Sequence, residues 1–239
     1  MITTLVVTND FGPRSGGIET FIHGLLSQAS KNQQRNFVVL TSRQSPEDEV
    51  IKFDNQMWEE SRIRVIRDTA KVLLPTRRLA NKATELFKAH NCENVIFGAS
   101  APLGLLAKSL RKVGAKHIVA LTHGHEVWWA KLPIFKLAMR RIGNSCDVLT
   151  YLGPYTKSAI AKSVGIKTSL VQIAPGISTE LFKPGSKPAD LVAKYQIGNR
   201  PTLLCVGRLV HRKGQDRLIE AMGKIKEEIP DALLLLIGS

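Results

Sequence analysis

The stretch Cys205-Val-Gly-Arg-Leu-Val-His-Arg-Lys-Gly-Gln-Asp216 decides the fold of this chain. An apolar strand is predicted over Thr202–Val206, and it leads through Gly207 into a cationic loop and then a helix. The cations of the loop are Arg208, Arg212 and Lys213. The first turn of a helix favours an anion, and Arg and Lys side chains bind phosphate oxygens. The local pattern therefore predicts either a phosphate site or a solvated basic loop.

The beginning of the chain has the same order of strand, loop and helix. Ile2–Thr8 is an apolar run, and apolar residues at three- and four-residue spacing from Ile18 to Ala29 predict an amphipathic helix. Gly16 and Gly17 precede that helix, where glycines let the backbone approach a pyrophosphate. A tight turn alone would also explain them. The spacing is not Gly-x-Gly-x-x-Gly, which disfavours a dinucleotide site.

The middle of the chain indicates a parallel sheet. Asn94–Ser100, Pro102–Val113 and His117–Thr122 read as strand, helix and strand, a crossover that joins parallel strands. The polar segment Ser42–Glu60 is predicted to be a solvated excursion. Prolines and glycines between 177 and 201 indicate a linker.

The fold class predicted from these patterns is α/β. It consists of an N-terminal Rossmann-like domain at 1–176, the linker at 177–201, and the start of a second Rossmann-like domain at 202–239. Two strands and one helix cannot cover both faces of a parallel sheet, so we expect the second domain to be truncated.

The predicted strand at 117–122 ends in His123-Gly-His-Glu126. Ligands of open parallel sheets bind beyond the carboxyl ends of the strands, so this is a candidate site. No further cluster of His, Cys or Asp nearby completes a metal ligand set, and no metal is predicted. Gly98–Pro102 resembles a nucleophile elbow but lacks its second glycine, which argues against a hydrolase.

Composition narrows the partners. The chain has 34 Lys plus Arg and 20 Asp plus Glu, a formal charge of +14, which favours nucleic acid, an anionic membrane or a phosphorylated small molecule. No basic and aromatic stacking platform or recognition helix is evident, so nucleic-acid binding is not predicted. Its three dispersed cysteines are typical of a cytosolic protein with reduced thiols. No stretch has the roughly 20 apolar residues of a membrane span.

Two predicted helices are basic and amphipathic, at Thr76–His90 and Ile134–Ile142. Either helix is compatible with contact to an anionic membrane surface. The modest apolar face of the first favours an ordinary surface helix. The aromatic residues before the second, Trp128 and Trp129, are equally compatible with a role in closing the core.

Several segments carry a resemblance to a known family. The glycine loop after the first strand and Gly207-Arg-Leu-Val-x-Arg-Lys-Gly214 resemble the GT-B retaining glycosyltransferases of family four. The branch that the chain is most similar to is the actinobacterial phosphatidylinositol monomannoside mannosyltransferases. The segments that carry this closer likeness are Val7–Phe11, Arg14–Ile18, Leu74–Thr76, Ala101–Ala107, Leu121–Glu126 and Thr150–Gly153.

The resemblance implies a function for particular residues. GDP-mannose would be the donor substrate, bound between the two domains, with no cofactor. Arg208 and Lys213 match the pair that binds the donor diphosphate and stabilises the departing charge. Gly16 and Gly17 match the loop that approaches the diphosphate and sugar. The roles of catalytic residues fall to His123, near the transferred sugar, and Asp10, on a loop where acceptor hydroxyls enter.

The resemblance also implies a location. An inositol phospholipid acceptor would place the protein in the cytoplasm, as a peripheral protein at the inner face of the cell membrane. The glutamate-rich motif of the family, which holds the nucleotide ribose and the sugar, lies beyond Ser239, so we expect the 239-residue chain alone to be inactive. Two alternatives stay open: a transferase for another nucleotide sugar or acceptor, and a non-catalytic module that binds lipid or nucleotide.

Overall fold

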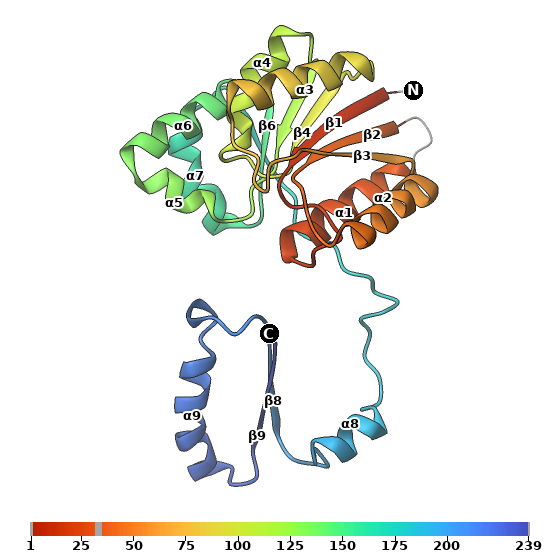
Figure 1. Cartoon of the computed structure of the whole chain (residues 1–239). Helices are drawn as coiled ribbons and strands as arrows, with labels where there is room; N and C mark the ends of the chain where they lie inside the picture. Colours follow the sequence, from red (N-terminus) through yellow and green to blue (C-terminus); the bar gives the residue numbers. More distant parts are fainter. Residues whose placement is uncertain (1, 32–34, 239) are drawn as a thin grey trace. The chain divides into compact units, whose positions relative to one another are not determined.

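The structure is a computed structural model that describes residues 2–31 and 35–238. Contacts between Cα atoms divide the chain into two compact units, Met1–Ile177 and Ser178–Ser239. Figure 1 shows the sheet of each unit with its helices.

The first unit alternates strands and helices along the chain. Its strands are β1 (Ile2–Thr8), β2 (Arg35–Thr41), β3 (Ile63–Arg67), β4 (Asn94–Phe97), β5 (His117–Ala120), β6 (Val148–Tyr151) and β7 (Ser169–Gln172). Its α-helices are α1 (Gly17–Ser30), α2 (Glu47–Ser61), α3 (Arg77–Ala89), α4 (Ala107–Lys112), α5 (Glu126–Lys131), α6 (Pro133–Gly143) and α7 (Pro154–Val164). A short 3₁₀ helix, Leu103–Leu106, precedes α4.

The described strands of this unit form one parallel sheet in the order β3-β2-β1-β4-β5-β6-β7. The order reverses between β1 and β4, which is the arrangement of a doubly wound Rossmann-like sheet. The predicted α/β class and parallel sheet are confirmed. In such a sheet the crevice for a ligand opens at the carboxyl ends of β1 and β4, where their loops diverge.

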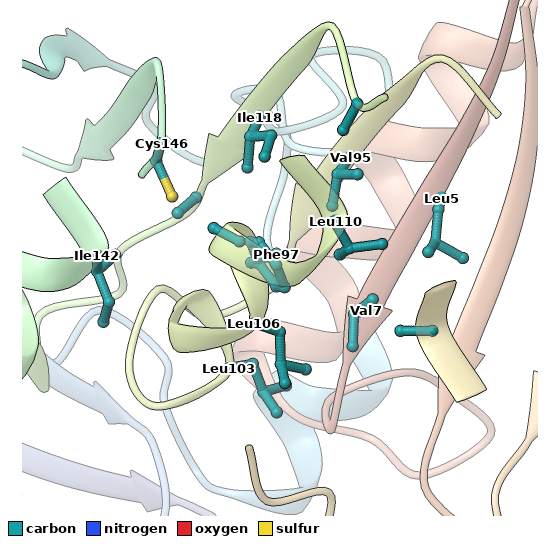
Figure 2. Close-up of a cluster of buried hydrophobic side chains, with 14 of the residues drawn as sticks. Leu5, Val7, Val95, Phe97, Leu103, Leu106, Leu110, Ile118, Ile142 and Cys146 are labelled. Carbon is teal, nitrogen blue, oxygen red and sulfur yellow. The ribbon is translucent and has the colours of Figure 1, made fainter. Parts of the chain in front are cut away.

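Successive residues of β1 point to opposite faces of the sheet. Val6 belongs to a core with Ile22 and Leu26 of α1 and Met57 of α2. Leu5 and Val7 belong to the core of the other face, together with buried residues of α3, α4, α6 and α7. Figure 2 shows part of this second core, and Figure 1 shows α1 and α2 on one side of the sheet and α3 and α4 on the other.

The prediction of a solvated excursion at Ser42–Glu60 is wrong. Most of that segment is helix α2, in which Val50 and Met57 are buried. Phe53, on the same side, packs edge-on against Phe11 with ring centroids 5.6 Å apart. The acidic residues of the first turn suit the positive end of the helix dipole, and three apolar residues are enough to fix the helix on the sheet.

The second unit contains α8 (Ala189–Lys194), β8 (Thr202–Val206), α9 (Gln215–Glu228) and β9 (Leu233–Ile237). Strands β8 and β9 pair in parallel, from Thr202 with Leu233 to Val206 with Ile237. The predicted order of strand, cationic loop, helix and strand is therefore present. A 3₁₀ turn at His211–Lys213 precedes Gly214, whose φ of 73° is the left-handed conformation that glycine favours.

Candidate functional site

The first part of the candidate site is the loop after β1, which is held from several sides. Asn9 exchanges two hydrogen bonds with the backbone of Leu73, at 3.0 and 2.6 Å. Arg67, at the end of β3, donates to the Gly12 carbonyl at 2.6 Å and binds Asp54 through two nitrogens at 2.7 and 2.8 Å. These contacts fix the path of the backbone toward Gly16 and Gly17.

Gly16 is the N-cap of α1 and brings no side chain to cap the helix. A Cβ atom there would lie 2.2 Å from Oε2 of Glu19, whereas a Cβ on Gly17 would meet nothing within 4 Å. Glu19 is buried in the first turn of α1, and Arg14 pairs with it at 2.9 Å. A Cβ on Gly16 would therefore displace the Glu19 carboxylate, whereas Gly17 leaves the start of the helix open to a ligand.

Asp10 follows β1 and its backbone N–H donates to Oγ1 of Thr8 at 3.0 Å. Its carboxylate lies 3.5 Å from the Arg14 guanidinium. Burial raises the pKa of Asp10 above its usual value and the charge of Glu19 adds to this, while Arg14, His123 and His125 act in the opposite direction. Asp10 thus lies within electrostatic range of both histidines of the loop after β5.

His123 is fixed by its ring and by its backbone. Its Nε2 lies 2.6 Å from the Gly98 carbonyl, and its ring meets Phe21 edge-on with centroids 5.5 Å apart. A carbonyl only accepts, so Nε2 carries the proton and Nδ1 is the free acceptor of the neutral ring. The ring is therefore oriented for one proton-accepting contact.

Glu126 fixes the His123 backbone through hydrogen bonds. Its side chain is fully buried, and its Oε2 accepts from the N–H groups of His123 at 3.0 Å and Gly124 at 3.2 Å. Its Oε1 accepts from Ser100 Oγ at 3.0 Å. Gly124 has a φ of 96°, a conformation that glycine favours. Glu126 thereby joins the loops after β4 and β5 and the start of α5.

The second unit carries the cationic loop. Arg208 and Lys213 are exposed, and among the described residues no hydrogen bond or ion pair of either side chain is recorded. The aliphatic stem of Lys213 passes 3.9 Å from the position of a Cβ on Gly207. Gln215, at the start of α9, donates to the Arg208 carbonyl at 3.0 Å and fixes the loop. Two cations are therefore free for an anionic ligand.

The structure places the predicted site residues in two groups. Asp10, Gly16 and Gly17 follow the carboxyl end of β1, and His123 follows that of β5, with β4 between the two strands. Arg208 and Lys213 lie in one loop of the second unit. Glu126 was not predicted as a functional residue. The sequence signal for it was its place in the quoted segment His123–Glu126. No cluster of three or more His, Cys, Asp or Glu suited to a metal is found among the described residues.

Comparison with known proteins identifies the family. The family described as "Glycosyltransferase Family 4" matches residues 15–181, more than half of the chain. The chain belongs to glycosyltransferase family 4. A second description, "Glycosyl transferases group 1", matches residues 189–239.

Relatives within family 4 are similar over nearly the whole chain. The chain is 38% identical over 235 residues to the GDP-mannose-dependent alpha-(1-6)-phosphatidylinositol monomannoside mannosyltransferase of Mycolicibacterium smegmatis, covering 98% of the chain and 60% of that protein. It is 37% identical over 239 residues to the protein of the same name from Mycobacterium tuberculosis, covering 100% and 61%. The chain thus spans 60% and 61% of the lengths of these relatives.

A solved structure supports the same fold. Sucrose-phosphate synthase from Thermosynechococcus elongatus aligns with a TM-score of 0.72 at 20% identity, covering 100% of this chain and 63% of that one. Together with membership of family 4, this likeness in fold confirms the predicted GT-B class.

Proposed function

We propose that the full-length protein is a retaining mannosyltransferase that transfers mannose from GDP-mannose to a phosphatidylinositol mannoside. The observation that carries this proposal is the 38% identity, across 98% of the chain, to a mannosyltransferase named for that donor and acceptor. The arrangement of both loops agrees with such a reaction, since each presents groups suited to phosphate or hydroxyl recognition.

The donor diphosphate is proposed to bind Arg208 and Lys213. Both side chains are exposed, and both lie where the first strand of a Rossmann-like unit ends. The charge that develops on the leaving GDP would be stabilised by these two cations, the kind of contact that contributes most to a transition state. The backbone at Gly16 and Gly17 supplies further donors, because the first N–H groups of α1 have no partner within the helix.

The sugar and acceptor are proposed to meet at Asp10 and His123. In the proposed reaction the acceptor hydroxyl attacks the anomeric carbon from the face of the leaving group. The bond from that carbon to the phosphate oxygen breaks, a new glycosidic bond forms, and a phosphate oxygen of GDP takes the acceptor proton. His123 accepts a hydrogen bond from a sugar hydroxyl at Nδ1, while Asp10 orients the acceptor substrate.

The acceptor lipid suggests a peripheral location at the inner face of the membrane. None of the helices in the described part of the chain is long and apolar enough to cross a bilayer. A peripheral contact through basic surfaces would bring the site to its lipid substrate.

Radiolabel transfer by the full-length protein tests the proposal. GDP-mannose, GDP-glucose, UDP-glucose and UDP-N-acetylglucosamine are offered with phosphatidylinositol or its monomannoside. We expect label to enter lipid from GDP-mannose alone and only with the mannosylated acceptor. Transfer from a UDP-sugar would favour the related transferase, and binding of GDP-mannose without transfer would favour the non-catalytic module.

A further inference from the structure

Helices α5 and α6 present an exposed apolar surface. Near the start of α6 the side chains of Ile134 and Leu137 are 78% and 64% exposed, and Trp128 of α5 is 70% exposed. Leu132, between the helices, is exposed as well. We call these four residues the α5–α6 apolar surface. Large apolar side chains gathered in this way mark a contact surface rather than ordinary solvent exposure.

The apolar surface is held by a packed base. Met139 and Ile142, in the second half of α6, are fully buried in the core. Trp129 packs against that core, and its ring lies 4.7 Å from the ring of Phe135. Helices α5 and α6 also pack against each other and against α7. The first turn of α6 is therefore fixed in an outward position.

The segment that contains α5, α6 and α7 is strongly basic. Residues 127–167 contain seven Lys or Arg and one acid, Asp147, a net charge of +6. Asp147 is already paired with Arg111 at 2.7 Å. Lys136, Arg140 and Arg141 of α6 are exposed next to the apolar side chains. An apolar centre with a cationic border matches the headgroup region of an anionic bilayer, whereas a protein partner would need a large acidic rim.

Helix α3, the other basic helix of the sequence, lacks such a surface. Leu79, Ala83 and Phe87 form its apolar side and are buried in the core. Two of its cations, Arg78 and Lys82, bind the buried carboxylate of Asp68 at 2.8 and 3.0 Å. Helix α3 itself therefore offers cations but no exposed large apolar side chain, and the exposed Val72 and Leu74 lie in the segment before it.

We propose that the α5–α6 apolar surface inserts into an anionic bilayer, with Ile134 and Leu137 entering the acyl boundary and the surrounding cations binding lipid phosphates. This inference deepens the proposed function by assigning the membrane contact to one helix turn. It does not depend on which sugar is transferred. Insertion predicts a binding component that survives high salt, because salt screens the charges and leaves apolar burial intact.

The test measures sedimentation of the full-length protein with vesicles of phosphatidylcholine and phosphatidylglycerol, and with vesicles of phosphatidylcholine alone. The variant Ile134→Glu/Leu137→Glu changes exposed side chains only, so its fold should persist. We expect it to bind the anionic vesicles at least about tenfold more weakly than the wild type, since two apolar side chains no longer insert. Its residual binding should disappear at high salt.

A control is Ile51→Glu, which makes one substitution of the same kind at an exposed isoleucine of α2. This variant should bind as the wild type does. Fluorescence provides a second readout, because two of the three tryptophans, Trp128 and Trp129, lie in α5. Brominated lipid should quench them in the wild type and not in the double variant.

Equal binding of the double variant and the wild type would overturn the proposal. So would strong protection of the backbone amides of 128–137 from deuterium exchange before any vesicle is added, since protein would then cover the surface. Membrane binding that depends on Ile134 and Leu137 in a protein without mannosyl transfer would support this inference and reject the proposed function. The two can therefore fail separately.

Discussion

The buried carboxylate of Glu126 accepts a hydrogen bond from the backbone N–H of His123 at 3.0 Å, and it does so from a position that no ligand can reach. The relationship assigns different tasks to two residues three positions apart. His123 faces the proposed sugar site, and Glu126 determines where His123 lies.

Two substitutions of Glu126 distinguish the role of its hydrogen bonds from the role of its charge. In Glu126→Gln the amide oxygen can still accept from His123 and Gly124, while the amide NH₂ can donate to Ser100 Oγ, so we expect transfer within a few-fold of wild type. In Glu126→Ala the buried Ser100 hydroxyl and the partly buried N–H groups of His123 and Gly124 lose their acceptor, and transfer should fall about 10- to 100-fold, with lower thermal stability. The rate of mannosyl transfer and the unfolding temperature are measured together.

A double-mutant comparison then tests whether Glu126 acts through His123. If it does, the loss caused by Glu126→Ala should shrink in a His123→Ala background. Losses that multiply independently would show that Glu126 acts by another route.

Gly98 and Gly24 should respond oppositely to alanine. A Cβ on Gly98 would lie 2.3 Å from Thr8 Oγ1 and 2.7 Å from Ile22 Cδ1, so Gly98→Ala should destabilise the fold by roughly 1–3 kcal/mol. Gly24, in α1, has nothing within 4 Å of that position, and Gly24→Ala should stabilise by about 0.5–1 kcal/mol. Urea unfolding measures both changes. A stable Gly98→Ala protein would contradict the close contact between the ends of β1 and β4.

Arg208→Ala and Lys213→Ala should each reduce transfer by about 10²- to 10³-fold while leaving stability unchanged. Both side chains are exposed, so their loss removes ligand contacts rather than packing. Arg212→Ala, three positions before the start of α9 and also exposed, is the control and should lose far less activity. Binding of GDP, followed by calorimetry, distinguishes a weaker donor site from a slower chemical step. Full activity in the double variant would remove both residues from the donor site.

Asp68 should make the fold sensitive to acid. Hydrogen bonds from Arg78, together with those from Ala70 and Lys82, hold the pKa of Asp68 far below its usual value despite burial. The unfolded chain then binds a proton at a higher pH than the folded chain does. The stabilisation is therefore fully present above the ordinary pKa of an aspartate and declines as pH falls below about 4. Urea unfolding from pH 7 to 3 should show this slope in the wild type and a shallower one in Asp68→Asn.

Much of the fold follows from local patterns in the sequence. The apolar runs of β1 and β8, the glycines at 16 and 17 and the cations after β8 are each contained in a few consecutive residues. Periodicity and turn chemistry are sufficient there. The carboxyl ends of β4 and β5 were placed too late, because Gly98–Ser100 and Leu121–Thr122 continue the apolar pattern although they form the loops of the site.

The remainder depends on contacts between distant segments. Helix α2 was not predicted because most of its residues are charged or polar. Its apolar positions, Val50, Phe53 and Met57, stabilise a helix only when β1 and α1 provide a core to pack against. The part played by Glu126 requires Ser100, His123 and α5 to meet at one carboxylate. No short segment of the sequence contains all of these contacts. Likewise, the difference between α3 and α6 lies in which apolar side chains the core has already covered.

The residue after β9 also contacts a segment that is distant in the sequence. A Cβ on Gly238 would lie 1.8 Å from the carbonyl oxygen of Gly207, so the backbones that follow β8 and β9 touch directly. Gly207 is the residue before Arg208. A substitution at Gly238 would therefore act like a mutation of the cationic loop, although the two positions are 31 residues apart in the sequence. In a survey of random variants, position 238 should belong to the same functional group as Arg208.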